Sequence, residues 1–168
     1  MNLDQLNRLP HDDTVDLLTR CCGATRWADE VADKRPFEST DHLFEMADQV
    51  WWELGRDDWL EAFSAHPKIG DIDSLREKFS STKPWSEDEQ SGVESASEEV
   101  LHRLAEANEE YEEKFGYIFI VCATGKSAAQ MLGILEERLP NEPGDEIEVA
   151  AGEQAKITRI RLEKLLGS

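Results

Sequence analysis

Apolar residues recur at helical spacing along almost the whole chain, and this pattern limits the fold more than any other feature. In the stretch DHLFEMADQVWWELG, one helical face comprises Leu43, Ala47, Val50, Trp51 and Leu54. Comparable spacing, interrupted by Gly and Pro, predicts helices at about 12–23, 25–36, 40–54, 57–63, 72–79, 86–115, 127–139 and 145–166. The sequence therefore predicts an all-α fold with about eight helices.

Residues suited to helix ends lie at several of these boundaries. Asp12 or Asp13 is expected to cap the first helix, and Ser39 or Thr40 the third, because their side chains accept hydrogen bonds from free backbone N–H groups. Gly116 is expected to stop the longest helix, since glycine readily adopts the left-handed conformation common at helix ends.

One segment departs from helical spacing. YIFIVCA, residues 117–123, is a continuous apolar run rich in aromatic and β-branched residues, which predicts a short buried extended segment. A lone strand cannot form a sheet, so helix ends, side chains or a ligand must satisfy its backbone polar groups. The following ATGKSA ends like a phosphate-binding loop, but Ile120 stands where that loop needs a glycine. Nucleotide binding is therefore disfavoured, whereas the helix start after this turn remains a candidate cradle for a small anion.

The chain is long enough for one sizeable core. Its 168 residues, 39% of them hydrophobic and five of them Trp, predict a single domain over 1–168. The net charge of -19 is spread along the chain and argues against nucleic acid as a partner. Simple solubility and adaptation to a salt-rich cytoplasm both account for such acidity, and neither identifies a substrate.

The three cysteines are typical of a reducing cytosol. Cys21 and Cys22 are adjacent and Cys122 stands alone, so there is no disulfide framework and no metal-ligand spacing. No secretion signal and no apolar run long enough for a bilayer is recognisable. We therefore expect a cytoplasmic protein without a metal or a membrane partner. Cys122 paired with a histidine is an alternative nucleophile, although a thiol in an apolar run is more often inert.

Two places in the middle of the chain carry side chains suited to proton transfer. In FSAHPKIGD, His66 directly precedes Pro67, which restricts the backbone and favours an extended conformation for the histidine. His66 is either a general acid or a spare loop histidine. Ser86 and Glu89 have the spacing of a capping box, which fixes a helix start and is also compatible with a role in a pocket.

Two arginines near the end of the chain differ in their helical position. Arg161 falls beside Ile147, Gln154 and Leu165 in the apolar stripe of the last helix, whereas Arg159 points to the opposite face. A charge inside an apolar stripe needs a partner or a ligand.

Taken together, five stretches in this order resemble one family. They are RPF, DWLEAFSAHPKIGD, WSEDEQSGV, YEEKFGYIFIVCATGKSA and EQAKITRIRLEKL. They are similar to the 2-oxo-4-hydroxy-4-carboxy-5-ureidoimidazoline (OHCU) decarboxylases, a family of urate degradation. The resemblance implies an all-α fold, a homodimer, and conversion of a small anionic substrate to (S)-allantoin without a cofactor.

The same resemblance implies the site residues. His66 matches the family's proton donor, and Glu89 and Arg161 match its catalytic carboxylate and arginine. The substrate-binding residues that it implies are Pro67, Ser86, Glu87, Asp88, Gln90, Phe119, Ile120, Val121, Cys122 and Ala123. Another small-molecule lyase or hydrolase with the same His, Glu and Arg, and a non-catalytic helical interaction module, are the two alternatives.

Overall fold

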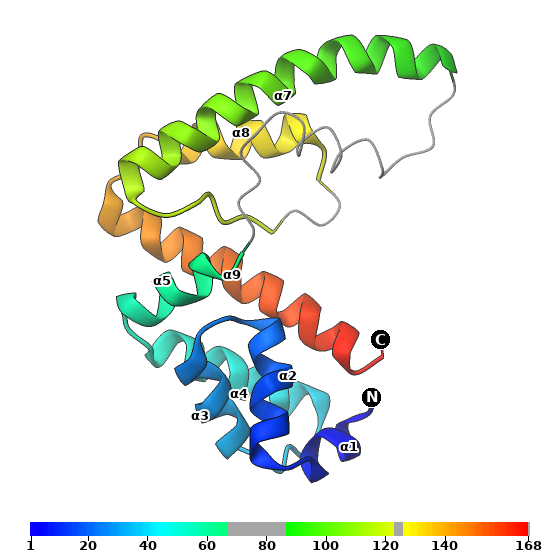
Figure 1. Ribbon diagram of the computed structural model, residues 1–168, viewed down its shortest axis with the longest axis vertical. Helices are drawn as coiled ribbons and strands as arrows, with labels where there is room; N and C mark the ends of the chain where they lie inside the picture. Colours follow the sequence, from blue (N-terminus) through cyan, green and yellow to red (C-terminus); the bar gives the residue numbers. More distant parts are fainter. Residues whose placement is uncertain (67–86, 123–125, 168) are drawn as a thin grey trace. The chain divides into compact units, whose positions relative to one another are not determined.

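The computed structural model describes residues 1–66, 87–122 and 126–167, and of residues 87–97 the backbone alone. These residues form eight helices and no strand (Figure 1). The prediction of an all-α fold is confirmed. The helix expected at about 72–79 lies outside the described residues.

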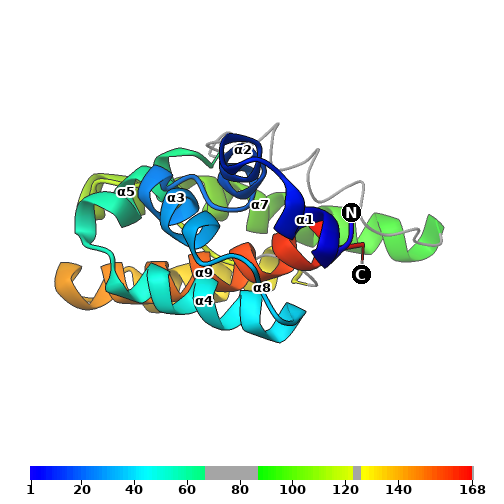
Figure 2. The ribbon, with the colours of Figure 1, turned by 90° about the horizontal axis from the view of Figure 1, so that it is seen from below.

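The chain divides into two compact units, of which the first comprises residues 1–66 and 147–168. Its helices are α1 (Leu3–Arg8), α2 (His11–Cys21), α3 (Thr25–Asp33), α4 (Thr40–Glu53), α5 (Arg56–Ser64) and most of α9 (Pro143–Leu165). Helix α3 packs against α2, α4 and α5. Helix α4 runs beside α9, as Figure 2 shows from below.

Two buried tryptophans join the helices of the first unit. Trp27 of α3 is fully buried and donates its indole N–H to the Ala47 carbonyl of α4, at 2.9 Å. Trp51 of α4 donates to the Ala151 carbonyl of α9, at 3.0 Å. Because a buried indole N–H needs an acceptor, these bonds fix the spacing of the helices as well as fill the core.

The second unit comprises residues 67–146. Helix α7 (Glu87–Phe115) packs against α8 (Ala128–Arg138). Between them, residues 117–122 have no helical or strand assignment, and Tyr117, Ile120 and Cys122 are buried. A short buried extended segment was predicted over 117–123; the described residues 117–122 depart from helix as expected, whereas the extended conformation stays a prediction.

The predicted helix ends are correct where one residue type determines them. The Ser39 hydroxyl caps α4, and Gly116 has a φ of 85°, which suits glycine and ends α7. The prediction for the first long helix is wrong, because the N-cap of α2 is Pro10 and no side chain caps it. Asp12 and Asp13 lie instead in the first turn, where their charge suits the helix dipole.

None of the helices in the described part of the chain is both long enough and apolar enough to cross a membrane. The expectation of a single domain over 1–168 stays a prediction, because each of the two units is described by itself.

Candidate active site

His66 lies just beyond the end of α5 in the first unit. Helix α5 ends at Ser64, Ala65 is its C-cap, and the His66 backbone N–H donates to the Phe63 carbonyl, at 3.2 Å. Because the next residue in the sequence is Pro67, which has no N–H to donate, a further helical turn is disfavoured. The His66 side chain is therefore carried at a helix end, and it is half-buried.

Gly23 makes room for this end of α5. A side-chain carbon at residue 23 would collide with the Ala65 side chain, directly before His66. Since the colliding atom belongs to a short alanine at a helix end, the helix itself would have to move. The position of His66 thus depends on a glycine that follows α2.

The His66 ring is held by Gln154, a fully buried side chain of α9. His66 Nε2 lies 2.5 Å from Gln154 Oε1, and Gln154 Nε2 donates to Thr158 Oγ1 at 3.1 Å. Residues four apart lie on the same face of a helix, so Gln154 and Thr158 form a continuous polar line inside an otherwise apolar surface. The helical spacing predicts Gln154 beside Arg161 but indicates no role for it.

The pKa of His66 is lowered from its ordinary value. Burial is the main cause, because it disfavours the charged imidazolium; the hydrogen bond with Gln154 acts in the opposite direction, and the positive charge of Arg161 lowers the pKa further. The neutral imidazole is therefore the resting form at neutral pH. When such a ring does take up a proton, it becomes a stronger acid than an exposed histidine.

Arg161 is half-buried on α9, as its place in the apolar stripe predicted. Its Nη1 donates to the Cys21 carbonyl at the end of α2, at 3.5 Å. Burial raises the pKa of Cys21 and of Cys22 to about 11, although Arg161 acts against this, so both thiols stay neutral near pH 7. These cysteines are therefore unsuited to be nucleophiles or metal ligands.

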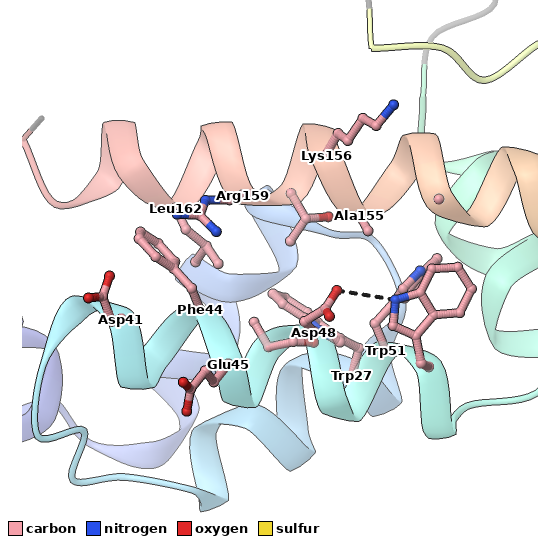
Figure 3. Close-up of a pocket in the computed structure, with 14 residues that line it drawn as sticks. Trp27, Asp41, Phe44, Glu45, Asp48, Trp51, Ala155, Lys156, Arg159 and Leu162 are labelled. Carbon is pink, nitrogen blue, oxygen red and sulfur yellow. Dashed lines mark hydrogen bonds between the residues drawn. The ribbon is translucent and has the colours of Figure 1, made fainter.

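Arg159 lies on another face of α9, in a groove between α4 and α9 (Figure 3). Its guanidinium stands 4.5 Å from the centre of the Phe44 ring, and its Nε donates to Glu163 at 3.3 Å. The groove has a volume of about 600 Å³ and includes Asp48, which accepts a hydrogen bond from the exposed Trp52. Neither His66 nor Arg161 lines it.

In the second unit, side chains satisfy the backbone of the extended segment. Arg138 Nη1 donates to the Ile120 carbonyl and Lys126 Nζ to the Cys122 carbonyl, both at 2.8 Å. The same Arg138 forms a buried ion pair with Glu146, at 2.5 Å, and Glu146 accepts a further hydrogen bond from the Tyr111 hydroxyl. Side chains were one of the three predicted means of satisfying this backbone.

The residues that resemble a phosphate-binding loop have structural roles as far as they are described. Lys126 is engaged by Cys122, and the Ser127 hydroxyl caps α8 by accepting from the Gln130 N–H, at 3.2 Å. The Cys122 side chain is buried. These contacts favour a structural role both for the described residues of the ATGKSA turn and for Cys122.

Several residues expected in the site cannot be placed. Pro67, Ser86 and Ala123 lie outside the described residues. Four further residues belong to the first turns of α7, where the side chains lie outside the described part: Glu87, Asp88, Glu89 and Gln90. Of the predicted substrate-binding segment, Phe119 and Val121 are partly exposed.

The sequence model of one family, that of OHCU decarboxylase, matches residues 7–163. The chain belongs to the OHCU decarboxylase family.

The chain is also similar in sequence to individual OHCU decarboxylases and related proteins. The chain is 39% identical over 146 residues to a uric acid degradation bifunctional protein of Arabidopsis thaliana, covering 86% of this chain but 45% of that protein. It is 30% identical over 142 residues to an OHCU decarboxylase of Mus musculus, covering 82% and 77% of the two chains. A crystal structure of OHCU decarboxylase in the presence of (S)-allantoin is 37% identical, with a TM-score of 0.73 and coverage of 91% and 99%.

Two of the three residues predicted to be catalytic, His66 and Arg161, lie in the first unit. The charge of Arg161 acts on the His66 ring, and both side chains are half-buried. Gln154 and Thr158 are additional members of this cluster that the sequence analysis did not predict. A polar residue seven positions before Arg161, inside the same apolar stripe, was the signal available for Gln154.

Proposed function

We propose that this chain decarboxylates OHCU to (S)-allantoin without a cofactor. The observation that carries the proposal is the family match over residues 7–163. The cluster of His66, Gln154 and Arg161 supports it, because it offers a titratable ring, held by Gln154, whose pKa responds to the charge of Arg161.

The reaction itself explains why side chains suffice. When CO₂ leaves the ring carbon that bears the hydroxyl, the electron pair of the broken bond forms a C=C bond with the neighbouring ring carbon. The electrons of the adjacent C=N bond then move onto nitrogen, which takes up one proton. The resulting enol becomes a ring carbonyl group when its hydroxyl proton is lost and the ureido-bearing carbon gains a proton. The substrate thus supplies its own electron sink, and the protein has to orient groups and move protons.

His66 is assigned the proton transfer to carbon. In its neutral resting form the ring can accept the hydroxyl proton of the enol, and the imidazolium so formed can deliver a proton to one face of the neighbouring carbon. Its lowered pKa suits both steps, because the imidazolium is a good donor and does not persist. Delivery to one face gives the single enantiomer.

Arg161 and Glu89 are assigned to the substrate. With a net charge of -19 the average field of the chain repels an anion, so a local cation must provide the attraction. The planar guanidinium of Arg161 can offer paired donors to substrate oxygens. Glu89 can accept hydrogen bonds from the ureido N–H groups.

A chiral assay tests the proposed function. Purified chain is mixed with freshly oxidised urate, and the formation of optically active allantoin is followed by circular dichroism without added metal or cofactor. An OHCU decarboxylase accelerates the appearance of one enantiomer. A non-catalytic interaction module leaves the spontaneous racemic course unchanged, and a different lyase or hydrolase consumes the substrate without forming chiral allantoin.

The two arginines are expected to respond differently to replacement by lysine. Arg161→Lys keeps the charge but loses the planar fork, so we expect turnover to fall by about tenfold or more, the worth of roughly one charge-assisted hydrogen bond. Arg159→Lys is the matched control, because the same change is made on an exposed side chain two residues away. It is expected to alter the free energy of unfolding by no more than about 0.5 kcal/mol. Decarboxylation and thermal melting are measured for both, and equal activities would contradict the role of Arg161.

A homodimer in a reducing cytosol is part of the proposal. Trp52 supports an association, because its side chain remains 44% exposed next to the buried Trp51. Three buried cysteines outside any disulfide support a reducing compartment. Light scattering at micromolar concentration is expected to give about twice the 19.1 kDa of one chain. A mass of one chain would contradict the dimer and would leave the proposed chemistry intact.

A further inference from the structure

We propose that Gln154 is a positioning residue that holds His66 as the Nε2–H tautomer, so that Nδ1 is the ring nitrogen that exchanges the proton. The kinetic part of this inference rests on the proposed function, whereas the tautomer does not.

The orientation of the Gln154 amide follows from its two contacts. The side chain is fully buried, and a buried amide is costly unless its donors and its acceptor are both paired. Gln154 Nε2 donates to Thr158 Oγ1 at 3.1 Å, which leaves Oε1 facing His66 Nε2 at 2.5 Å. An amide oxygen cannot donate, so the proton between them belongs to His66.

Thr158 can continue the same chain of donors. Its hydroxyl also shares a hydrogen bond with the Cys22 thiol, whose pKa is raised to about 11 by burial and which therefore stays a neutral, weak partner. The hydroxyl has a single proton. While that proton is directed to the thiol sulfur, the oxygen accepts from Gln154, and the chain of donors runs in one direction from His66 to Cys22.

As a result, the two ring nitrogens of His66 have different chemical roles. Nε2 is bonded to Gln154 in both the neutral and the charged ring, because it carries a proton in both. Nδ1 is the nitrogen that changes its protonation, and it is the one that Gln154 does not hold. The ring is thereby oriented by one edge and reactive at the other, as in other buried histidines whose second nitrogen fixes the tautomer.

Among the described residues, the two side chains that act on the pKa of His66 both belong to α9. Arg161 of α9 lowers the pKa of His66, and the hydrogen bond of Gln154 raises it. Cys21 and Cys22, at the end of α2, are neutral near pH 7. Changes at Gln154 are therefore expected to move the pKa of His66 in a direction that depends on the charge introduced.

Two substitutions at Gln154 test this with opposite signs. Gln154→Glu places a carboxylate against Nε2–H, which stabilises the imidazolium, so the pKa of His66 is expected to rise. Gln154→Leu removes the acceptor, so the pKa is expected to fall and the Nδ1–H tautomer to become populated. The ring ¹⁵N shifts and their pH dependence, assigned by comparison with His66→Asn, measure both quantities without substrate.

Glu153→Gln is the matched control for charge. It changes a carboxylate on the next residue of the same helix, which pairs with Lys156 at 2.7 Å, and it is expected to leave the His66 tautomer and pKa unchanged. The exchange variant with both Glu153→Gln and Gln154→Glu keeps the net charge of the chain and moves one carboxylate next to His66. It is expected to show the raised pKa of Gln154→Glu.

Kinetics complete the test. The acid limb of the kcat/KM profile is expected to move to higher pH in Gln154→Glu and to lower pH in Gln154→Leu. The kcat of Gln154→Leu is expected to fall by about 10²-fold, with a smaller change in KM.

A shift of the pKa in the same direction in both variants, or an unaltered tautomer in Gln154→Leu, would overturn the proposal. Expected NMR shifts in a chain without decarboxylase activity would instead overturn the proposed function alone. If Gln154→Leu does not fold, the ring ¹⁵N shifts of His66 in the unsubstituted chain decide, because an Nδ1–H tautomer there would overturn the proposal.

Discussion

His66→Asn is expected to lower the rate of decarboxylation by about 10²–10⁴-fold, the usual worth of a positioned general acid or base. The asparagine amide cannot exchange a proton near neutral pH, so the enol would have to rely on water for the transfer to carbon. Loss of stereochemical control is expected together with the loss of rate, because water reaches both faces. The measurement is the circular dichroism of allantoin formed from freshly oxidised urate.

The structural cost of the same change is expected to be limited. His66 lies beyond the end of α5 and is half-buried, but its loss leaves Gln154 Oε1 without its partner, which costs about 1–3 kcal/mol. His102→Asn is the control, because that side chain on α7 is 63% exposed and its replacement should change neither rate nor melting. Near-normal turnover of folded His66→Asn would remove His66 from the mechanism.

Arg138→Met is expected to destabilise the chain by about 3–5 kcal/mol, the usual cost of breaking a buried ion pair from one side. The change would leave the fully buried Glu146 carboxylate without its cation and the Ile120 carbonyl without its donor. For a chain of this length, about 2–4 °C of melting temperature is lost per kcal/mol, so a decrease of roughly 6–20 °C should be seen by calorimetry.

A double-mutant cycle separates the ion pair from the loss of packing. Glu146→Gln alone is expected to destabilise the chain by a similar amount, because it leaves the Arg138 charge buried against the Tyr111 and Phe119 rings. The variant with Arg138→Met and Glu146→Gln together should be more stable than the sum of the two losses predicts, since no buried charge remains. Strict additivity would show that the two side chains act independently.

Local signals in the sequence predicted most of the helices. Ser39 and Ser127 cap helices within three residues of themselves, and Gly116 ends one through its own backbone angle, so no distant contact was needed. Helix α1 was not predicted, because six residues are too few to show a helical period. The start of α2 was placed too late because Pro10 takes the N-cap position without a side-chain bond.

The site was less accessible to sequence reasoning than the helices were. The position of Arg161 in an apolar stripe can be worked out from the spacing within α9 alone. The partner of Gln154 is 88 residues away in the sequence, and that of Arg161 is 140 residues away. Periodicity describes which face a side chain occupies, but it contains no information on which residue of another helix lies opposite. For the same reason Arg138 was not predicted as the donor to the extended segment.

Gly23, which lies against Ala65 directly before His66, has a consequence for protein engineering. Replacing glycine by alanine is a common route to thermostable variants, because it reduces the freedom of the unfolded chain. Gly133, Gly144 and Gly152 have open space where the new methyl group would lie and are suitable positions. At Gly23 the same methyl group would overlap with the Ala65 side chain. A screen that scores residual activity after heating would then record a failed stabilisation, although the methyl group had displaced the His66 ring, which lies beyond the end of α5.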